Sequence, residues 1–104
     1  MKKILAILKS TKLDSRVRLG IMSILVVNEW VEFKTLKEML DLQDGNLASH
    51  IKVLEKEKYI DIRKQFVGRK PQTTYQVTDV GRTAFDNHLN ALEALIKRKD
   101  GVDD

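Results

Sequence analysis

The sequence contains no cysteine, which excludes disulfide bonds, cysteine-ligated zinc and iron–sulfur clusters. A chain without cysteine suits a reducing compartment, and we expect a cytoplasmic location. Histidine is nearly as scarce, because only His50 and His88 are present and no carboxylate spacing beside them suggests a metal site. The sequence therefore predicts neither a bound metal nor another cofactor.

Long hydrophobic runs are also missing. The apolar run Ile4–Leu8 covers five residues, whereas a secretory signal needs about 7–15 and a membrane-spanning helix about 20. This segment is therefore predicted to be a short helix with one apolar face, and no association with a membrane is expected.

Catalytic signatures are absent from the chain as well. It has no P-loop, no GxGxxG motif, no nucleophile elbow and no HExxH motif. The adjacent residues Ser49 and His50 diverge by about 100° on a helix, so they cannot form a nucleophile–base pair. We therefore do not expect an enzyme.

What the chain does have is the composition of one globular domain. Its 104 residues are 42% hydrophobic and 33% charged, without a repeat or a Pro/Gly/Ser-rich stretch, so residues 1–104 are predicted to form a single domain. The net charge of +4 is modest, but residues 63–76 contain four basic side chains and no acidic one. Charge concentrated in one segment indicates phosphate contact better than total charge does.

Apolar residues that recur at three- and four-residue steps predict the helices. The predicted helices cover approximately residues 2–10, 15–28, 36–41, 45–57 and 79–99. Four of them begin with residues that cap helices well: Asp14, the capping box Thr35-x-x-Glu38, Asp44 and Thr78.

Short alternating segments predict the strands. One covers residues 30–33, and two others, 59–67 and 73–77, flank a turn at 68–71 that contains glycine and proline. The expected fold class is mainly α with a small antiparallel β-hairpin wing. This is a winged helix-turn-helix with its core at about 13–77 and terminal dimerisation helices at about 2–10 and 78–99. Four side chains outside the 45–57 helix are also expected inside: Val27, Met39, Phe66 and Tyr75.

The helix predicted at 45–57 has two distinct faces when residues are placed 100° apart. An apolar stripe of Leu47, Ile51 and Leu54 is expected to face the core. The candidate DNA contacts are the polar or cationic residues away from that stripe or at its edge: Asn46, Ser49, His50, Lys52 and Lys56. Asn and Ser can bond base edges or phosphates, and lysines suit phosphates. The alternative reading is an ordinary solvated helix face.

The predicted hairpin supplies a second group of candidates. Arg69 and Lys70 lie at its tip, where an arginine can enter a narrow minor groove. Arg63 and Lys64 point to opposite faces of a strand, so at most one of them faces the duplex. Thr35, at the start of the helix predicted at 36–41, is a further candidate contact.

Both ends of the chain carry apolar residues that need a partner. In the last helix these residues step by four, three and four, as in a heptad seam: Phe85, Leu89, Leu92 and Ile96. The first helix contributes Ile4, Leu5 and Leu8. Packing within the chain explains only part of this apolar length, so a homodimer joined through both terminal helices is expected.

Taken in order, several segments resemble the small winged-helix transcriptional regulators of the MarR and ArsR type. The matching segments are 14–21, 36–40, 45–55, 59–60, 68–75 and 78–82, within a likeness that covers about residues 13–98. The family usually has glycine where this chain has Lys58, and a lysine kept in the left-handed conformation there bears a strain of about 1 kcal/mol.

The resemblance implies a dimeric bacterial or archaeal regulator that binds double-stranded DNA at a pseudo-palindromic operator. It places Asn46, Ser49, His50 and Lys52 in the major groove, with Arg69 and Lys70 on the wing. Many relatives bind a small-molecule effector beside the dimer helices, although no pattern here marks a pocket. The metal sensors of the ArsR type use cysteines, which this chain lacks.

The alternative function is a winged helix that serves as a protein-interaction or RNA-binding module. An interaction module should show an apolar outward face on the 45–57 helix and a neutral wing. Single-stranded RNA requires exposed aromatic side chains for stacking, and most of the few aromatic residues are needed inside. The charge of the wing and of the helix face favours duplex DNA.

Overall fold

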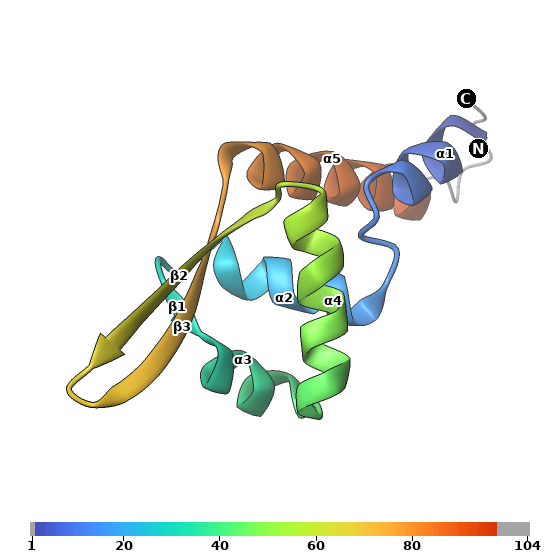
Figure 1. Ribbon diagram of the computed structural model, residues 1–104. Coiled ribbons are helices and arrows are strands. Elements are labelled where there is room, and N and C mark those ends of the chain that lie inside the picture. Colours follow the sequence, from blue (N-terminus) through green and yellow to red (C-terminus); the bar gives the residue numbers. More distant parts are fainter. Residues whose placement is uncertain (1, 98–104) are drawn as a thin grey trace.

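The computed structural model describes residues 2–97, which contain five helices and a three-stranded antiparallel sheet (Figure 1). The elements follow in the order α1 (Lys2–Ser10), α2 (Arg16–Leu25), β1 (Val31–Glu32), α3 (Phe33–Leu40), α4 (Asp44–Lys56), β2 (Ile60–Val67), β3 (Lys70–Val77) and α5 (Asp79–Ile96). The expected fold class is confirmed, and the predicted end of the last helix at residue 99 lies outside the described residues. None of the helices in this range combines the length and the apolar character that a membrane crossing needs.

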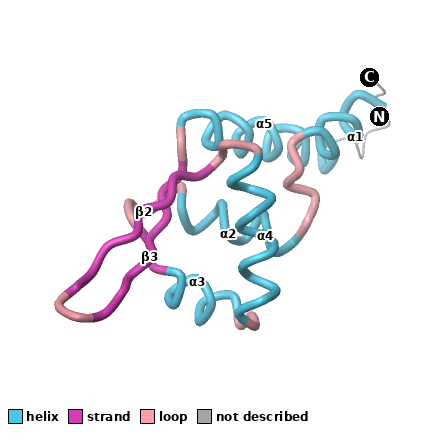
Figure 2. The backbone as a smooth tube through the Cα atoms, viewed as in Figure 1, coloured by secondary structure: helices cyan, strands magenta, loops and turns pink. Residues whose placement is uncertain are grey.

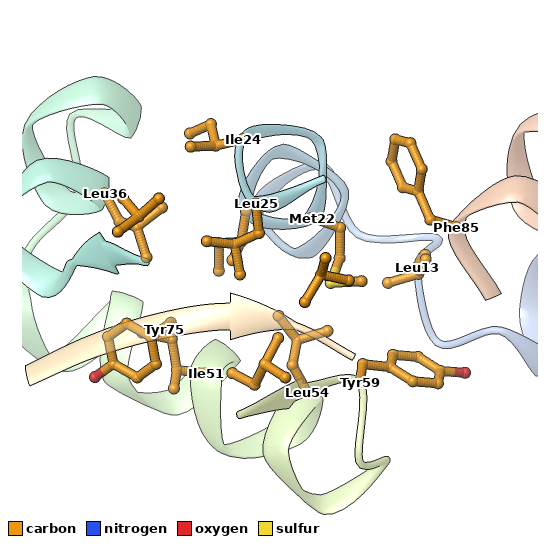
Figure 3. Packing of buried hydrophobic residues seen from close by; sticks show 14 of the residues in the cluster. Leu13, Met22, Ile24, Leu25, Leu36, Ile51, Leu54, Tyr59, Tyr75 and Phe85 are labelled. Carbon is orange, nitrogen blue, oxygen red and sulfur yellow. The ribbon is translucent and has the colours of Figure 1, made fainter. Parts of the chain in front are cut away.

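The core lies where α2, α3 and α4 meet the base of the sheet and α5 (Figure 3). Its completely buried large side chains are Leu13, Ile21, Met22, Leu25, Leu36, Leu47 and Leu54. The predicted stripe of α4 is confirmed, since Leu47 and Leu54 are fully buried and Ile51 is 5% exposed. Burying each such side chain contributes about 1.5–3 kcal/mol, so this stripe fixes the rotation of α4 against the core.

The start of α2 differs by one residue from the prediction, whereas the start of α5 agrees with it. Ser15, and not Asp14, caps α2, because the Ser15 Oγ accepts the backbone N–H of Arg18 at 3.3 Å. Asp14 instead lies 3.9 Å from the Arg18 guanidinium. Thr78 caps α5 as predicted, since its Oγ1 accepts the backbone N–H of Gly81 at 2.9 Å.

The predicted starts of α3 and α4 were also wrong. Because α3 begins at Phe33, directly after β1, Thr35 lies inside the helix and the predicted capping box does not form. In α4 the N-cap is Gln43, and Asp44 is the first helical residue. There the carboxylate of Asp44 suits the positive end of the helix dipole and pairs with Lys37 at 2.7 Å.

The β2–β3 hairpin extends well beyond the body of the molecule, and the sheet has the order β1-β3-β2 (Figure 2). Val67 pairs with Lys70 across a two-residue loop in which Gly68 has a φ of 64° and Arg69 does not have a positive φ. This is the φ pattern of a type II′ turn. Strand β3 starts earlier than predicted and includes Pro71, which is tolerated because β1 pairs only with Thr74 and Tyr75 and leaves that side of the strand free.

Three of the four further residues expected in the core are exposed, and the fourth is buried as predicted. Val27 follows the end of α2 and is 77% exposed, while Met39 of α3 is 61% exposed. Phe66 is 73% exposed because no element covers the outer end of the hairpin, whereas Tyr75 at its base is buried.

Helix α1 packs against the C-terminal half of α5, and together they form an arm that projects from the winged helix (Figure 1). The chain measures 59 × 26 × 21 Å, and its radius of gyration of 15.6 Å exceeds the roughly 13 Å of a compact chain of this length. The arm is held by a buried bond. Thr11 Oγ1 and Nδ1 of His88 share a hydrogen bond of 2.7 Å, and Thr11 Oγ1 also lies 3.0 Å from the carbonyl oxygen of Leu8.

The left-handed residue after α4 provides a test of the backbone strain. Lys58 has a φ of 63° and its side chain is exposed, so replacing it removes no core contact. We expect Lys58→Gly to raise the free energy of unfolding by roughly 0.5–1 kcal/mol, measured by urea denaturation. Asp41, with a φ of 53°, is the matched control. Because aspartate tolerates this conformation better than lysine, Asp41→Gly should raise the free energy of unfolding by less. A loss of stability in Lys58→Gly would contradict the strain.

Candidate nucleic-acid interface

The outward face of α4 is the first part of the candidate interface. Asn46, Ser49, Lys52 and Lys56 are all exposed, as the sequence predicts. The Ser49 hydroxyl donates to the backbone carbonyl of Asn46 at 3.0 Å, which leaves its oxygen free to accept a further bond. The face is small and polar near the start of the helix and cationic toward its end, and none of its exposed side chains is a large apolar one.

The strand register shows which wing cations face α4. Lys64 pairs with Thr73, and both line a groove of about 630 Å³ between the hairpin and α4. Arg63 pairs with Thr74 on the opposite face of the ribbon. Its guanidinium lies 4.3 Å from the centre of the Trp30 ring, a cation–π contact. Of these two candidate residues, Lys64 is therefore the one turned toward α4.

The groove between α4 and the hairpin has an apolar floor and cationic edges. Ile51, Ile62 and Tyr75 line its floor, while Lys52 of α4 and Lys64 of β2 line its two sides. A phosphate at the mouth of this groove would meet two ammonium groups from different elements. The groove therefore connects the helix face and the wing into one continuous surface.

A second groove, of about 550 Å³, lies between the hairpin and the start of α3. Lys34 and Lys70 both line it. The sequence pattern did not mark Lys34, because only the tertiary arrangement of α3 and the hairpin brings it into the same groove as Lys70. Thr35, its neighbour in α3, is half-buried. The wing cations Arg69 and Lys70 are exposed at the tip, as expected.

His50 is held in one protonation state by a residue of α2. The Arg18 guanidinium has only donors, so its 3.1 Å bond to Nδ1 of His50 requires a lone pair there and places the ring proton on Nε2. Arg18 is itself fixed, because its Nε donates to the carbonyl of Lys12 at 2.7 Å. Burial, and then the charge of Arg18, lower the pKa of His50 below its ordinary value. His50 therefore offers a neutral N–H donor and not a positive charge.

The predicted dimer seam divides into buried and exposed members. Phe85 belongs to the core of its own chain and Ile4 is also buried within it, so the seam is corrected for these two residues. Leu8 and Leu92 are half-buried. The apolar members left exposed are Leu5 at 52%, Leu89 at 40% and Ile96 at 75%.

Comparisons with known proteins agree with this geometry. A family model for winged helix DNA-binding domains matches residues 17–96. MJ0432, an uncharacterized protein of Methanocaldococcus jannaschii, is 37% identical over 84 residues, which cover 81% of this chain and 91% of that protein. The structure of a transcriptional regulator homologue from Pyrococcus horikoshii OT3 has a TM-score of 0.83 and 36% identity, covering 93% of this chain and 96% of that one.

More distant solved structures share the fold alone. Bacillus subtilis PadR, solved in complex with operator DNA, has a TM-score of 0.65 at 17% identity over 72% of this chain and 47% of that one. A MarR-family regulator from Silicibacter pomeroyi has a TM-score of 0.61 at 16% identity over 94% of this chain and 70% of that one.

The lowered pKa values of the two histidines determine how stability should depend on pH. Burial lowers the pKa of His88 as well, although the nearby Asp14 partly raises it. The folded protein thus binds fewer protons at both histidines than the unfolded chain does. Stability should be fully present above about pH 6.5 and fall as the pH drops through the folded pKa values. We expect an NMR titration to give both histidines pKa values below about 6.5.

The variant Arg18→Met separates the two causes at His50. It removes the neighbouring charge but not the burial, so the pKa of His50 should rise part of the way toward its ordinary value. Nitrogen chemical shifts should show the proton on Nε2 of His50 in the wild type. A His50 that titrates at or above its ordinary value, or that ignores the substitution, would contradict this geometry.

Proposed function

The chain belongs to the family of winged helix DNA-binding domains, and we propose that it is a sequence-specific transcriptional regulator that binds an operator as a homodimer. The family is one of DNA-binding regulators and not of enzymes. The observation that carries the proposal is the continuous polar and cationic surface formed by the outward face of α4 and the α4-facing side of the hairpin.

In this proposal α4 enters the major groove. That groove is about 12 Å wide and accepts a helix with its side chains, about 10–12 Å across. Asn46 and Ser49 lie toward the N-terminal end and can bond base edges, while the small residues Gly45 and Ala48 allow close approach. Lys52, farther along the helix, reaches the flanking phosphates.

His50 and the wing complete the contact set. The neutral imidazole can donate its Nε2–H to a phosphate oxygen or a base acceptor, and Arg18 fixes the ring for that task. Lys64 faces the same side of the molecule as α4, and Arg69 and Lys70 extend the surface to the tip. These cations would follow the backbone next to the major groove that α4 occupies.

The projecting arm supports the homodimer. Leu5 and Ile96 place apolar surface on α1 and at the end of α5, away from the α4 face, and an extended protomer leaves this surface open to solvent. A two-fold axis through the arms would bury it in both copies. Two copies of α4 would then meet major grooves about 34 Å apart, one turn of the duplex, on an inverted repeat.

The protein-interaction and RNA-binding alternatives receive less support. The outward face of α4 is polar and cationic where an interaction helix would be apolar. Among the described residues, Phe66 is the only aromatic side chain that is more than half exposed, and binding of single strands uses several stacking platforms.

Removing single wing cations tests the DNA-binding surface. Lys64→Ala, Arg69→Ala and Lys70→Ala should each weaken binding to a random-sequence duplex and reduce the slope of log affinity against log salt by about one. Fluorescence anisotropy across a salt series measures both quantities. Arg63→Ala is the matched control, because the Arg63 guanidinium is held over the Trp30 ring, away from the hairpin tip, and its loss should leave the slope unchanged. Unchanged slopes in the three wing variants would remove the wing from the mechanism.

Charging the exposed apolar end of the arm tests the dimer. Ile96 is 75% exposed, so Ile96→Asp should fold normally yet shift the protein to monomers in sedimentation equilibrium, with much weaker operator binding. Val27→Asp provides the control, because Val27 is equally exposed but lies outside the arm. Dimers that persist in Ile96→Asp, or monomers that bind an operator at full affinity, would contradict the two-fold arrangement.

A further inference from the structure

The outer end of the hairpin exposes apolar side chains next to its cations. Phe66 is 73% exposed and Val67 is 56% exposed, although Phe85 and Tyr75 are both buried in the core. Single exposed apolar residues are common on protein surfaces. Two adjacent ones at the end of a cationic ribbon, one of them aromatic, form a feature that phosphate binding alone does not require.

The register fixes the position of Phe66 relative to the DNA-facing groove. Phe66 pairs with Pro71, and Lys64 pairs with Thr73. Residues two apart in a strand point to the same face, so Phe66 shares the face of Lys64 and lies about 7 Å farther out along the ribbon. The tight Gly68-Arg69 turn closes the hairpin just beyond it. The phenyl ring, with Pro71 directly across from it, therefore lies at the outer end of the side of the wing that would face the duplex.

We propose that Phe66 is an apolar wedge that enters the minor groove beside the site occupied by α4 and partly unstacks one base step. The inference rests on the proposed DNA-binding function and adds a contact to it. Side chains at a hairpin tip can enter the minor groove, which is about 6 Å wide, whereas the whole ribbon cannot. Phenylalanine is among the residues with which minor-groove proteins unstack base steps and kink the duplex.

Charge determines which partner the tip accepts. Lys64 shares the face of Phe66, and Arg69 and Lys70 lie at the turn just beyond it, so cations on both sides along the ribbon attract phosphates to this end of the hairpin. The same three cations oppose contact between two hairpin tips, so a second copy of this chain is a poor partner for the exposed ring. Duplex DNA satisfies both parts of the surface, because its backbone binds the cations and its bases receive the ring.

The wedge also gives the protein a means of reading sequence without a hydrogen bond. Pyrimidine–purine steps such as TA and CA unstack easily, whereas A-tracts are stiff. An operator with a flexible step at the wing position should therefore bind more tightly. This preference would lie outside the base pairs that α4 contacts.

The experiment uses a duplex recovered by in vitro selection with the wild-type protein and labelled at both ends. Anisotropy gives the affinity, and energy transfer between the ends gives the bend. Phe66→Ala should bind roughly tenfold more weakly and bend the duplex less. The salt slope should stay unchanged because no phosphate contact is lost. Phe66→Leu should keep most of the affinity and the bend, since leucine is also an effective wedge.

A matched change in the DNA tests the same contact from the side of the bases. Replacing the flexible step at the wing position by an A-tract should weaken the wild type and leave Phe66→Ala unaffected. Val80→Ala is the protein control, because Val80 is 57% exposed but belongs to α5. Circular dichroism melting checks that the Phe66 variants remain folded, which we expect because the Phe66 side chain is exposed.

Two outcomes overturn the wedge. One is a Phe66→Ala variant with the affinity and bend of the wild type. The other is a change of oligomeric state in Phe66→Ala, which would place the ring between copies of the chain. A wild type that binds no duplex at all would reject the proposed function itself, whereas a DNA-binding wild type with an inert Phe66 rejects only the wedge.

Discussion

The burial of one apolar stripe on α4 is the constraint on which the other functional positions depend. Leu47, Ile51 and Leu54 lie together in the core and fix the rotation of a rigid helix, so its opposite face must point outward. The hairpin follows α4 after a three-residue connection in which Lys58 is left-handed, and the pair of Ile62 and Tyr75 continues the same core. Once that pair is set, strand alternation alone directs Lys64 and then Phe66 to the face of α4.

Polar bonds attach the rest of the chain to this frame. Arg18 links the segment before α2 to the middle of α4, because it bonds both the Lys12 carbonyl and His50. His88 bonds Thr11 and thereby holds the end of α1 against α5. The segment that connects the arm to the winged helix is thus bonded at one end to the arm and, through Arg18, at the other end to α4. Both histidines act as neutral hydrogen-bonding groups, and protonation of either one opposes the folded arrangement.

Features set by local periodicity were accessible from the sequence. The inner stripe of α4, the glycine turn of the hairpin and the Thr78 cap each depend on a few neighbouring residues, and the structure has all of them. The left-handed conformation of Lys58 was expected from the family resemblance, and the structure has it too. Features set by which element covers another were not. Adjacent Asp14 and Ser15 both suit a cap, and pairing of β1 starts α3 before the expected capping box. Phe85 and Phe66 are the same type of residue, yet α2 covers only Phe85, and Phe66 stays exposed. The bond between Arg18 and His50 joins residues 32 positions apart, so no local pattern reveals it.

If two copies of this surface read one symmetric DNA site, selection in vitro from a random duplex pool should reveal that symmetry. Sequencing of the enriched fraction should give an inverted repeat whose half-sites are centred about one helical turn apart, near 10 base pairs. A pool with no enriched motif, or with a single asymmetric half-site, would show that the protein does not bind as a two-fold dimer.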